Sequence, residues 1–213
     1  DWHDVAPVPQ DDGPDPVVTI AYSDEFRMLM GYFRAVLRTQ EFSPRALFLT
    51  KNLLQHNAAN YTVWQYRRDC LRELAVDLNA ELDYVDSFAE ENPKNYQIWN
   101  HRRVIVEALK NASREKKFTE KVFSVDSKNY HAWAHRQWAV KTFDLWEGEI
   151  ALVELLLESD IRNNSAWNHR WFVVHNRWID DRKVAGQSAP VSSEECEAEL
   201  AFVWKALQVA KNN

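Results

Sequence analysis

The stretch Pro93-Lys94-Asn95-Tyr96-Gln97-Ile98-Trp99-Asn100-His101-Arg102-Arg103 decides the fold, because related stretches recur through the chain. Its tryptophan has counterparts at Trp64, Trp133 and Trp167, so the four indoles are spaced by 35, 34 and 34 residues. A period of about 34 residues is typical of stacked helical hairpins, in which each repeat is one pair of antiparallel helices. The sequence therefore predicts an all-α solenoid whose repeats start near residues 60, 95, 129 and 163.

Composition limits the kind of protein and its partners. The chain has only 4 Gly and 7 Pro, while 46% of its residues are hydrophobic and 27% are charged, as in a folded protein with few tight turns. A net charge of -6 offers no basic surface for nucleic acid, and no apolar run is long enough for membrane insertion. Cys70 and Cys196 lack a metal-binding spacing, so we expect free thiols and a cytoplasmic location.

The chain divides into two parts. Four prolines lie within residues 1–22, which predicts an extended Pro-rich N-terminal arm. Ser23 starts a helical-repeat domain, predicted to span residues 23–213, in which a leading hairpin precedes the tryptophan repeats. Each motif is expected to begin one helix and to be followed by a return helix, with a long loop at residues 177–191. Another motif is due at Asn212-Asn213, so we expect an array truncated at its C-terminus.

Three positions of the motif have the same predicted role in every repeat. The asparagine four residues before each tryptophan can cap the helix through its side-chain carbonyl. The tryptophan fills the seam between hairpins, and the arginine three residues later reaches carboxylates or carbonyls of a neighbouring helix. The histidines at 101, 135 and 169 form one column, but repeats stacked roughly 8–10 Å apart cannot share a metal ion. We therefore expect hydrogen-bonded packing histidines and no metal site on this chain.

The residues around each capping asparagine indicate a binding surface. Ala59, Lys94, Lys128 and Arg162 precede the asparagines, and Tyr61, Tyr96, Tyr130 and Asn164 follow them. Cations, phenols and free backbone donors at helix N-termini suit an anion, although solvated lysines are the alternative interpretation. We find no nucleophile elbow, glycine-rich phosphate loop or Cys/His pair, so the chain has no self-sufficient catalytic centre.

Four copies of this motif at a 34-residue period resemble the α-subunit repeats of protein prenyltransferases. Within this family the resemblance is strongest to the α subunits shared by protein farnesyltransferase and geranylgeranyltransferase type I. It is carried by Pro7-Val8-Pro9-Gln10-Asp11-Asp12-Gly13-Pro14, Pro16-Val17-Val18, Tyr22-Ser23, Tyr32-Phe33-Arg34-Ala35-Val36-Leu37, Pro93-Lys94-Asn95-Tyr96-Gln97 and Lys128-Asn129-Tyr130-His131. The resemblance implies a right-handed superhelical crescent of stacked antiparallel helical hairpins, similar to tetratricopeptide arrays, wrapped around an α/α-barrel β subunit in an obligate heterodimer.

The resemblance also implies a reaction. The heterodimer would transfer farnesyl or geranylgeranyl from an isoprenoid diphosphate to the thiol of a C-terminal Cys-a-a-X box, on proteins such as small GTPases. Zn²⁺ would be held by the β subunit, and Mg²⁺ would assist farnesyl transfer. On this chain Lys94 would reach the diphosphate, Tyr96 would line the same cavity, and Gln97 would hydrogen-bond the peptide carboxylate. Tyr61, Asn129, Tyr130 and His131 would line the neighbouring wall or support Lys94.

Two alternatives stay open at this point. The first is the α subunit of Rab geranylgeranyltransferase, which the Pro7-Val8-Pro9-Gln10 block argues against. The second is a non-catalytic, tetratricopeptide-like scaffold that binds proteins. The motif also departs from the pattern at Asn164, where the other copies have Tyr, and at Trp171, where the first two copies have a second Arg.

Overall fold

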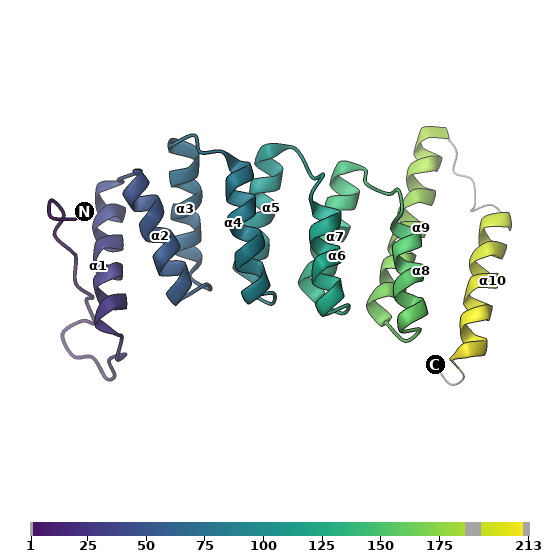
Figure 1. Cartoon of the computed structure of the whole chain (residues 1–213), viewed down its shortest axis with the longest axis horizontal. Helices are drawn as coiled ribbons and strands as arrows, with labels where there is room; N and C mark the ends of the chain where they lie inside the picture. The colour runs from purple at the N-terminus through teal and green to yellow at the C-terminus, as the bar shows by residue number, and fades with distance from the viewer. Residues whose placement is uncertain (1, 186–192, 211–213) are drawn as a thin grey trace. The chain divides into compact units, whose positions relative to one another are not determined.

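The computed structural model describes residues 2–185 and 193–210, and within them the chain is all-α. This confirms the predicted fold class. The helices are α1 (Asp24–Thr39), α2 (Pro44–His56), α3 (Tyr61–Glu73), α4 (Leu78–Glu91), α5 (Tyr96–Leu109), α6 (Glu115–Val125), α7 (Tyr130–Phe143), α8 (Glu149–Ser159), α9 (Asn164–Ala185) and α10 (Ser193–Val209). Figure 1 shows them in chain order. No helix in the described part of the chain is both long and apolar enough to cross a membrane.

The chain forms two compact units, Asp1–Lys110 and Asn111–Asn213. In the first unit α2 packs on α1 and α3, and α5 packs on α4 and α3. In the second unit α7 packs on α6, and α9 packs on α8 and α7. The division into an arm at 1–22 and one domain at 23–213 stays a prediction, although residues 2–22 contain neither helix nor strand.

The structure corrects the pairing of helices within a repeat. Within each unit a tryptophan-motif helix packs more closely on the helix before it than on the return helix after it, as α3 does on α2, α5 on α4, α7 on α6 and α9 on α8. The period of 34 residues is compatible with either pairing, so the sequence pattern alone could not distinguish them. The predicted loop at residues 177–191 is also wrong in its first half, because α9 continues to Ala185; residues 186–191 lie outside the described part of the chain.

The capping asparagines start the motif helices as predicted. The side-chain oxygen of Asn60 accepts from the backbone N–H of Val63 at 3.1 Å, and that of Asn95 accepts from Gln97 at 2.9 Å. Asn129 caps α7 in the same way, and Asn163 accepts from Ser165 and Ala166 at the start of α9. These bonds satisfy backbone donors that have no partner within the first turn.

The predicted roles of tryptophan and arginine in the seams are also confirmed. Trp64, Trp99 and Trp133 are at most 6% exposed, and Phe123 stacks on Trp133 with ring centroids 4.1 Å apart. The motif arginines are equally buried and pair with carboxylates of other helices. The pairs are Arg67 with Glu81, Arg102 with Asp86, Arg136 with Glu149 and Arg170 with Glu199.

Candidate functional site

The loop between α4 and α5 holds Lys94 in a defined position, directly before Tyr96 and Gln97 in the first turn of α5. The indole Nε1 of Trp99 donates to the carbonyl oxygen of Pro93 at 2.9 Å, which fixes the residue immediately before Lys94. On the other side of Lys94, the side chain of Asn95 caps α5. Lys94 is therefore held between two anchored residues, at the N-terminal end of a helix where backbone N–H groups and the helix dipole favour an anion.

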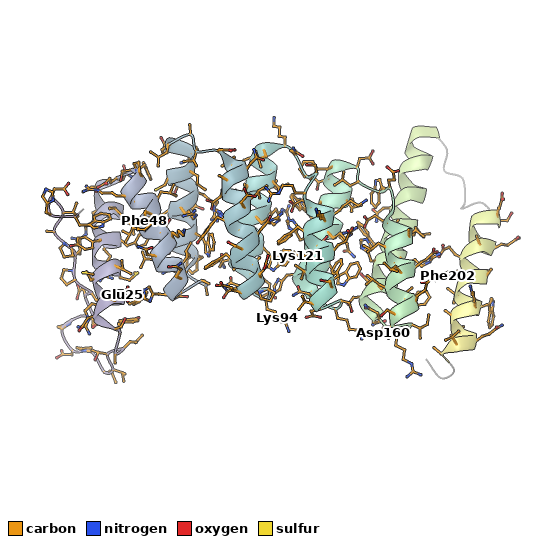
Figure 2. The ribbon with its side chains drawn as sticks, viewed as in Figure 1. Glu25, Phe48, Lys94, Lys121, Asp160 and Phe202 are labelled. Atoms are coloured by element: carbon orange, nitrogen blue, oxygen red, sulfur yellow. The ribbon has the colours of Figure 1, made fainter. Side chains whose placement is uncertain are left out.

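Lys94, Tyr96 and Gln97 lie around one open hollow of about 610 Å³. Its lining consists of Ala59, Glu91, Asn92, Pro93, Lys94, Asn95, Tyr96 and Gln97. Tyr96 is 68% exposed, Lys94 is exposed and Gln97 is half-buried, so all three can reach a ligand. Figure 2 shows Lys94 at the N-terminal end of α5, pointing away from the packed helices. The structure thus brings together the three residues expected to contact the diphosphate and the peptide carboxylate.

Tyr61 occupies the same register on α3 as Tyr96 does on α5. It is 71% exposed and follows Asn60, the cap of α3. Tyr61 does not line the hollow around Lys94, although Ala59, two residues earlier, does. The family resemblance implies that Tyr61 lines a neighbouring wall; this stays a prediction, and Tyr61 belongs to the same unit as the hollow.

The remaining predicted residues belong to the second unit. Tyr130 is 69% exposed and meets the ring of His131 edge-on, with centroids 5.5 Å apart. Asn129 differs from these two because its side chain is only 2% exposed and caps α7. Its contribution would therefore be to place Tyr130 and His131, which follow it. These three residues lie in a different unit from Lys94, so their role as a shared wall stays a prediction.

Lys128 has the same register in its repeat as Lys94 and forms an ion pair with a carboxylate of its own unit. Its ammonium lies 2.8 Å from a carboxylate oxygen of Asp160, in the loop between α8 and α9 where Figure 2 labels Asp160. The hydrogen bond from Lys128 and a second from the backbone N–H of Arg162 lower the pKa of Asp160 below its ordinary value. The cation at this position is thus shared with an acidic partner of the same chain.

Each motif tryptophan anchors the loop before its helix, a role that the sequence analysis missed. In every repeat Nε1 donates to the carbonyl six residues earlier, within 2.8–2.9 Å. The pairs are Trp64 with Ala58, Trp99 with Pro93, Trp133 with Ser127 and Trp167 with Ile161. The residue five positions before each tryptophan, which is Lys94 in the second repeat, is therefore placed by the same buried ring that fills the seam.

Three buried glutamates were also missed. Glu81, Glu115 and Glu149 each lie in the first turn of the helix that precedes a motif helix, and each is at most 4% exposed. Glu81 accepts two hydrogen bonds from Arg67, at 2.6 and 2.7 Å, and a third from Nε2 of His101 at 2.7 Å. Their spacing of 34 residues was the available signal in the sequence. Acidic residues are common in the first turn of a helix, so this spacing alone does not identify these glutamates as buried.

The histidines at 101, 135 and 169 are packing residues that form hydrogen bonds with these three glutamates. His135 contacts Glu115, and His169 contacts Glu149 at 2.8 Å. The Nδ1 atoms of His101 and His169 are buried and have no hydrogen-bond partner, so each ring is neutral and donates through Nε2. Burial lowers the pKa of both histidines, although the bonds to Glu81 and Glu149 oppose that shift. In the described residues no group of three or more His, Cys, Asp or Glu side chains could hold a metal ion.

These features, a repeated pair of helices with a tryptophan-anchored loop between them, define a class of helical-repeat protein. The model of the protein prenyltransferase alpha subunit repeat matches residues 43–74, 78–109, 112–143 and 146–177, so the chain belongs to this family. Each matched segment consists of one helix followed by a tryptophan-motif helix, which is the pairing that the packing shows.

Relatives with assigned functions lie within the same family. The chain is 58% identical over 92 residues to protein farnesyltransferase/geranylgeranyltransferase type-1 subunit alpha from Solanum lycopersicum, a match that covers 43% of this chain and 27% of that protein. It is 40% identical over 111 residues to the Schizosaccharomyces pombe protein of that name, covering 52% of this chain and 38% of the relative. The chain thus spans less than two fifths of these curated relatives.

A solved structure extends the similarity to the whole chain. A chain in the structure of Candida albicans protein geranylgeranyltransferase-I complexed with GGPP is 31% identical and matches with a TM-score of 0.88. The match covers 100% of this chain and 70% of that one. The fold is therefore that of a chain found in a prenyltransferase.

Proposed function

We propose that this chain is the α subunit of a heterodimeric protein prenyltransferase of the farnesyltransferase/geranylgeranyltransferase type I kind. The observation that carries this proposal is the hollow in which Lys94, Tyr96 and Gln97 meet on a chain of this family. The enzyme transfers farnesyl or geranylgeranyl from the isoprenoid diphosphate to the cysteine thiol of a Cys-a-a-X box. It is active only with its β subunit.

The proposed reaction explains why a cation belongs at the edge of this hollow. The thiolate sulfur attacks C1 of the isoprenoid, a C–S bond forms, the C–O bond to the diphosphate breaks, and diphosphate leaves with the electron pair. Negative charge grows on the bridging oxygen as that bond breaks. The ammonium of Lys94 at the N-terminus of α5 would stabilise this charge, and a donor already held in place does so without reorganisation.

Tyr96 and Gln97 would bind and orient the substrates beside Lys94. The exposed phenol of Tyr96 lines the cavity, while the amide of Gln97 can donate to the C-terminal carboxylate of the peptide. Tyr61 in the first unit, and Tyr130 and His131 in the second, would form the neighbouring wall, with Asn129 fixing the start of α7. The substrate thiol does not come from Cys70, which is buried and whose pKa is raised to about 11 by burial.

The exposed side of the motif helices would bind the β subunit. Tyr96, Asn100 and Arg103 lie at positions i, i+4 and i+7 of α5, on one side of the helix, and are exposed. In the second unit Asn168 and Trp171 occupy corresponding positions on α9, and Trp171 stacks on His175 with centroids 4.7 Å apart. Tyr, Trp and Arg with few acidic residues are typical of protein interfaces. We assign the catalytic Zn²⁺ to the β subunit, with Mg²⁺ assisting farnesyl transfer.

The test is Lys94→Ala in the heterodimer reconstituted with a prenyltransferase β subunit. We expect kcat for a Cys-a-a-X peptide to fall by about 100-fold or more, because the preorganised charge that would stabilise the leaving group is removed. Lys117→Ala, which removes an exposed lysine of α6, is the matched control and should leave kcat unchanged.

Two results would contradict the proposal at different levels. Unchanged turnover of the Lys94→Ala heterodimer would refute the role of Lys94. Failure of the wild-type chain to form an active complex with any prenyltransferase β subunit would favour the non-catalytic scaffold instead.

A further inference from the structure

The hollow around Lys94 is formed by two loops that precede different helices. Lys94, Tyr96 and Gln97 belong to the loop before α5 and to the first turn of α5, whereas Ala59 belongs to the loop before α3. A tryptophan of the following helix anchors each loop, but this bond joins a loop only to its own helix. The distance between the two sides of the hollow therefore depends on how α5 is held against α3.

His101 holds α5 against α3 by direct contact. Its side chain is 0% exposed and lies on α5, four residues after Gln97. The centroid of its ring lies 4.6 Å from a ring centroid of Trp64 on α3. Trp64 in turn donates to the carbonyl of Ala58, which is next to Ala59. Buried contacts thus connect one side of the hollow to the other through His101.

A second connection between α3 and α5 passes through Glu81 on α4. Nε2 of His101 donates to Oε1 of Glu81 at 2.7 Å, and Arg67 on α3 donates to both oxygens of the same carboxylate, at 2.6 and 2.7 Å. Burial lowers the pKa of His101; the bond to Glu81 opposes this shift, and the charges of Arg67 and Arg68 add to it. The charge of Glu81 is therefore balanced by Arg67, and the neutral His101 contributes a directed hydrogen bond.

An imidazole ring is suited to both contacts at once. Its flat face packs on an aromatic neighbour, while the N–H at its edge reaches a carboxylate. The second unit contains the same arrangement at His169, whose ring lies 4.9 Å from that of Trp133 on α7 and whose Nε2 lies 2.8 Å from Glu149. His169 holds α9, which carries no residue that we assign to the substrates. The two histidines thus share their contacts but hold helices with different proposed tasks.

We propose that His101 is a positioning residue, which sets the place of Lys94 and Gln97 relative to the side of the hollow formed by Ala59. This inference rests on the proposed function, because the placement of these side chains matters only if the hollow binds the substrates. A displaced Lys94 stabilises the leaving diphosphate less well, which lowers kcat. A displaced Gln97 binds the peptide carboxylate less well, which raises KM for the peptide. Displacements of about 1 Å are enough to lower enzymatic rates by up to about 100-fold.

The experiment measures His101→Leu in the heterodimer with the β subunit, alone and combined with Lys94→Ala. The leucine leaves Glu81 with its two bonds from Arg67, so no buried charge loses its partner. We expect kcat to fall about 10-fold when Lys94 is present but less than about 2-fold in the Lys94→Ala chain, because an absent lysine cannot be misplaced. KM for the peptide should rise about 10-fold in both chains, since both retain Gln97.

A general loss of folded enzyme gives a different result. Fewer active molecules lower kcat by the same factor with and without Lys94, and they leave KM unchanged. His169→Leu is the matched control, since it removes the same kind of ring and bond in the second unit. It should lower kcat by equal factors in the two chains.

His101→Gln tests the hydrogen bond separately from the ring. Glutamine retains an N–H donor for Glu81, so we expect kcat to fall by only about 3-fold, and this loss should also disappear in the Lys94→Ala chain. The glutamine variant decides the question if the leucine variant does not fold.

Three outcomes would overturn the inference. Equal factors in kcat with and without Lys94, or an unchanged KM, would show that His101 does not position the site, while leaving the proposed function intact. A glutamine variant as impaired as the leucine variant would show that the bond to Glu81 has no part in positioning. An inactive heterodimer of the wild-type chain would overturn the proposed function together with this inference.

Discussion

Replacement of Glu149 by glutamine tests whether the buried glutamates hold adjacent motif helices together. Both carboxylate oxygens of Glu149 accept from Arg136 on α7 at 2.8 Å. One of them also accepts from Nε2 of His169 on α9 at 2.8 Å, and the other lies 3.2 Å from Nζ of Lys116 on α6. A single side chain of α8, 0% exposed, thus connects three other helices of the second unit. Glutamine has nearly the same volume but presents one acceptor and one N–H₂ donor to these four donors.

We expect Glu149→Gln to lower the free energy of unfolding by about 3 kcal/mol. Removing one partner of a buried ion pair typically costs about 3–5 kcal/mol, because the other charge is left uncompensated. The loss falls at the lower end of this range because Arg136 keeps its bonds to the carbonyl of Lys116 and the hydroxyl of Thr119, at 2.9 and 2.7 Å. The pKa of Glu149 agrees with this magnitude. Burial alone would raise it, but the bonds from His169 and Arg136 lower it from 4.5 to about 2, which corresponds to about 3 kcal/mol.

The assay is urea unfolding of the full chain at pH 7, followed by far-ultraviolet circular dichroism and by tryptophan fluorescence. Coincident curves from the two probes are required before a single free energy is assigned, because repeat arrays can unfold in parts. Glu154→Gln is the matched control on the same helix. Its carboxylate is 43% exposed and accepts one bond from Arg170 at 3.1 Å, so we expect a loss below about 1 kcal/mol. If Glu149→Gln also lowers the free energy of unfolding by less than about 1 kcal/mol, Glu149 does not hold α6, α7 and α9 together.

Two further predictions follow from the same contacts. The free energy of unfolding should fall in two steps as the pH is lowered. The first step lies below about 6.5, because burial lowers the pKa of His169 in the folded chain and the unfolded chain therefore takes up this proton first. The second lies between about 4.5 and 2, where the unfolded chain protonates Glu149 before the folded chain does. Unfolding midpoints measured from pH 8 to pH 3 check this, and a midpoint independent of pH would contradict it. Trp99→Phe should lower kcat of the heterodimer several-fold, because it removes the bond that fixes Pro93 beside Lys94. Trp64→Phe removes the equivalent bond to Ala58, where no lysine follows, so it should reduce stability without that loss of turnover; equal kcat values for the two variants would show that Trp99 acts only in packing.

Much of the candidate site could be predicted because it depends on local sequence. Asn95 caps α5 and Lys94 precedes it, so the position of the lysine at a helix N-terminus followed from the order of residues alone. The hollow that joins Lys94, Tyr96 and Gln97 to Ala59 did not follow, because Ala59 belongs to another loop and reaches this place only through the packing of α3 on α5. The anchoring of each loop by a tryptophan also needed the structure, since an indole can fill a seam without donating to a particular carbonyl.

The sequence by itself determined the number of tryptophan repeats, their period, the caps of the motif helices and the class of the fold. These properties depend on residues within a few positions of each other, and repetition reinforces each of them four times. The tertiary structure decided which neighbour each motif helix packs on and which acidic residues become buried. It paired Arg67 with Glu81, and His101 with the same carboxylate, across 14 and 20 residues of chain. Such pairs form only where helices pack against one another, within a repeat or between repeats, because burial removes water as the competing partner of each charge.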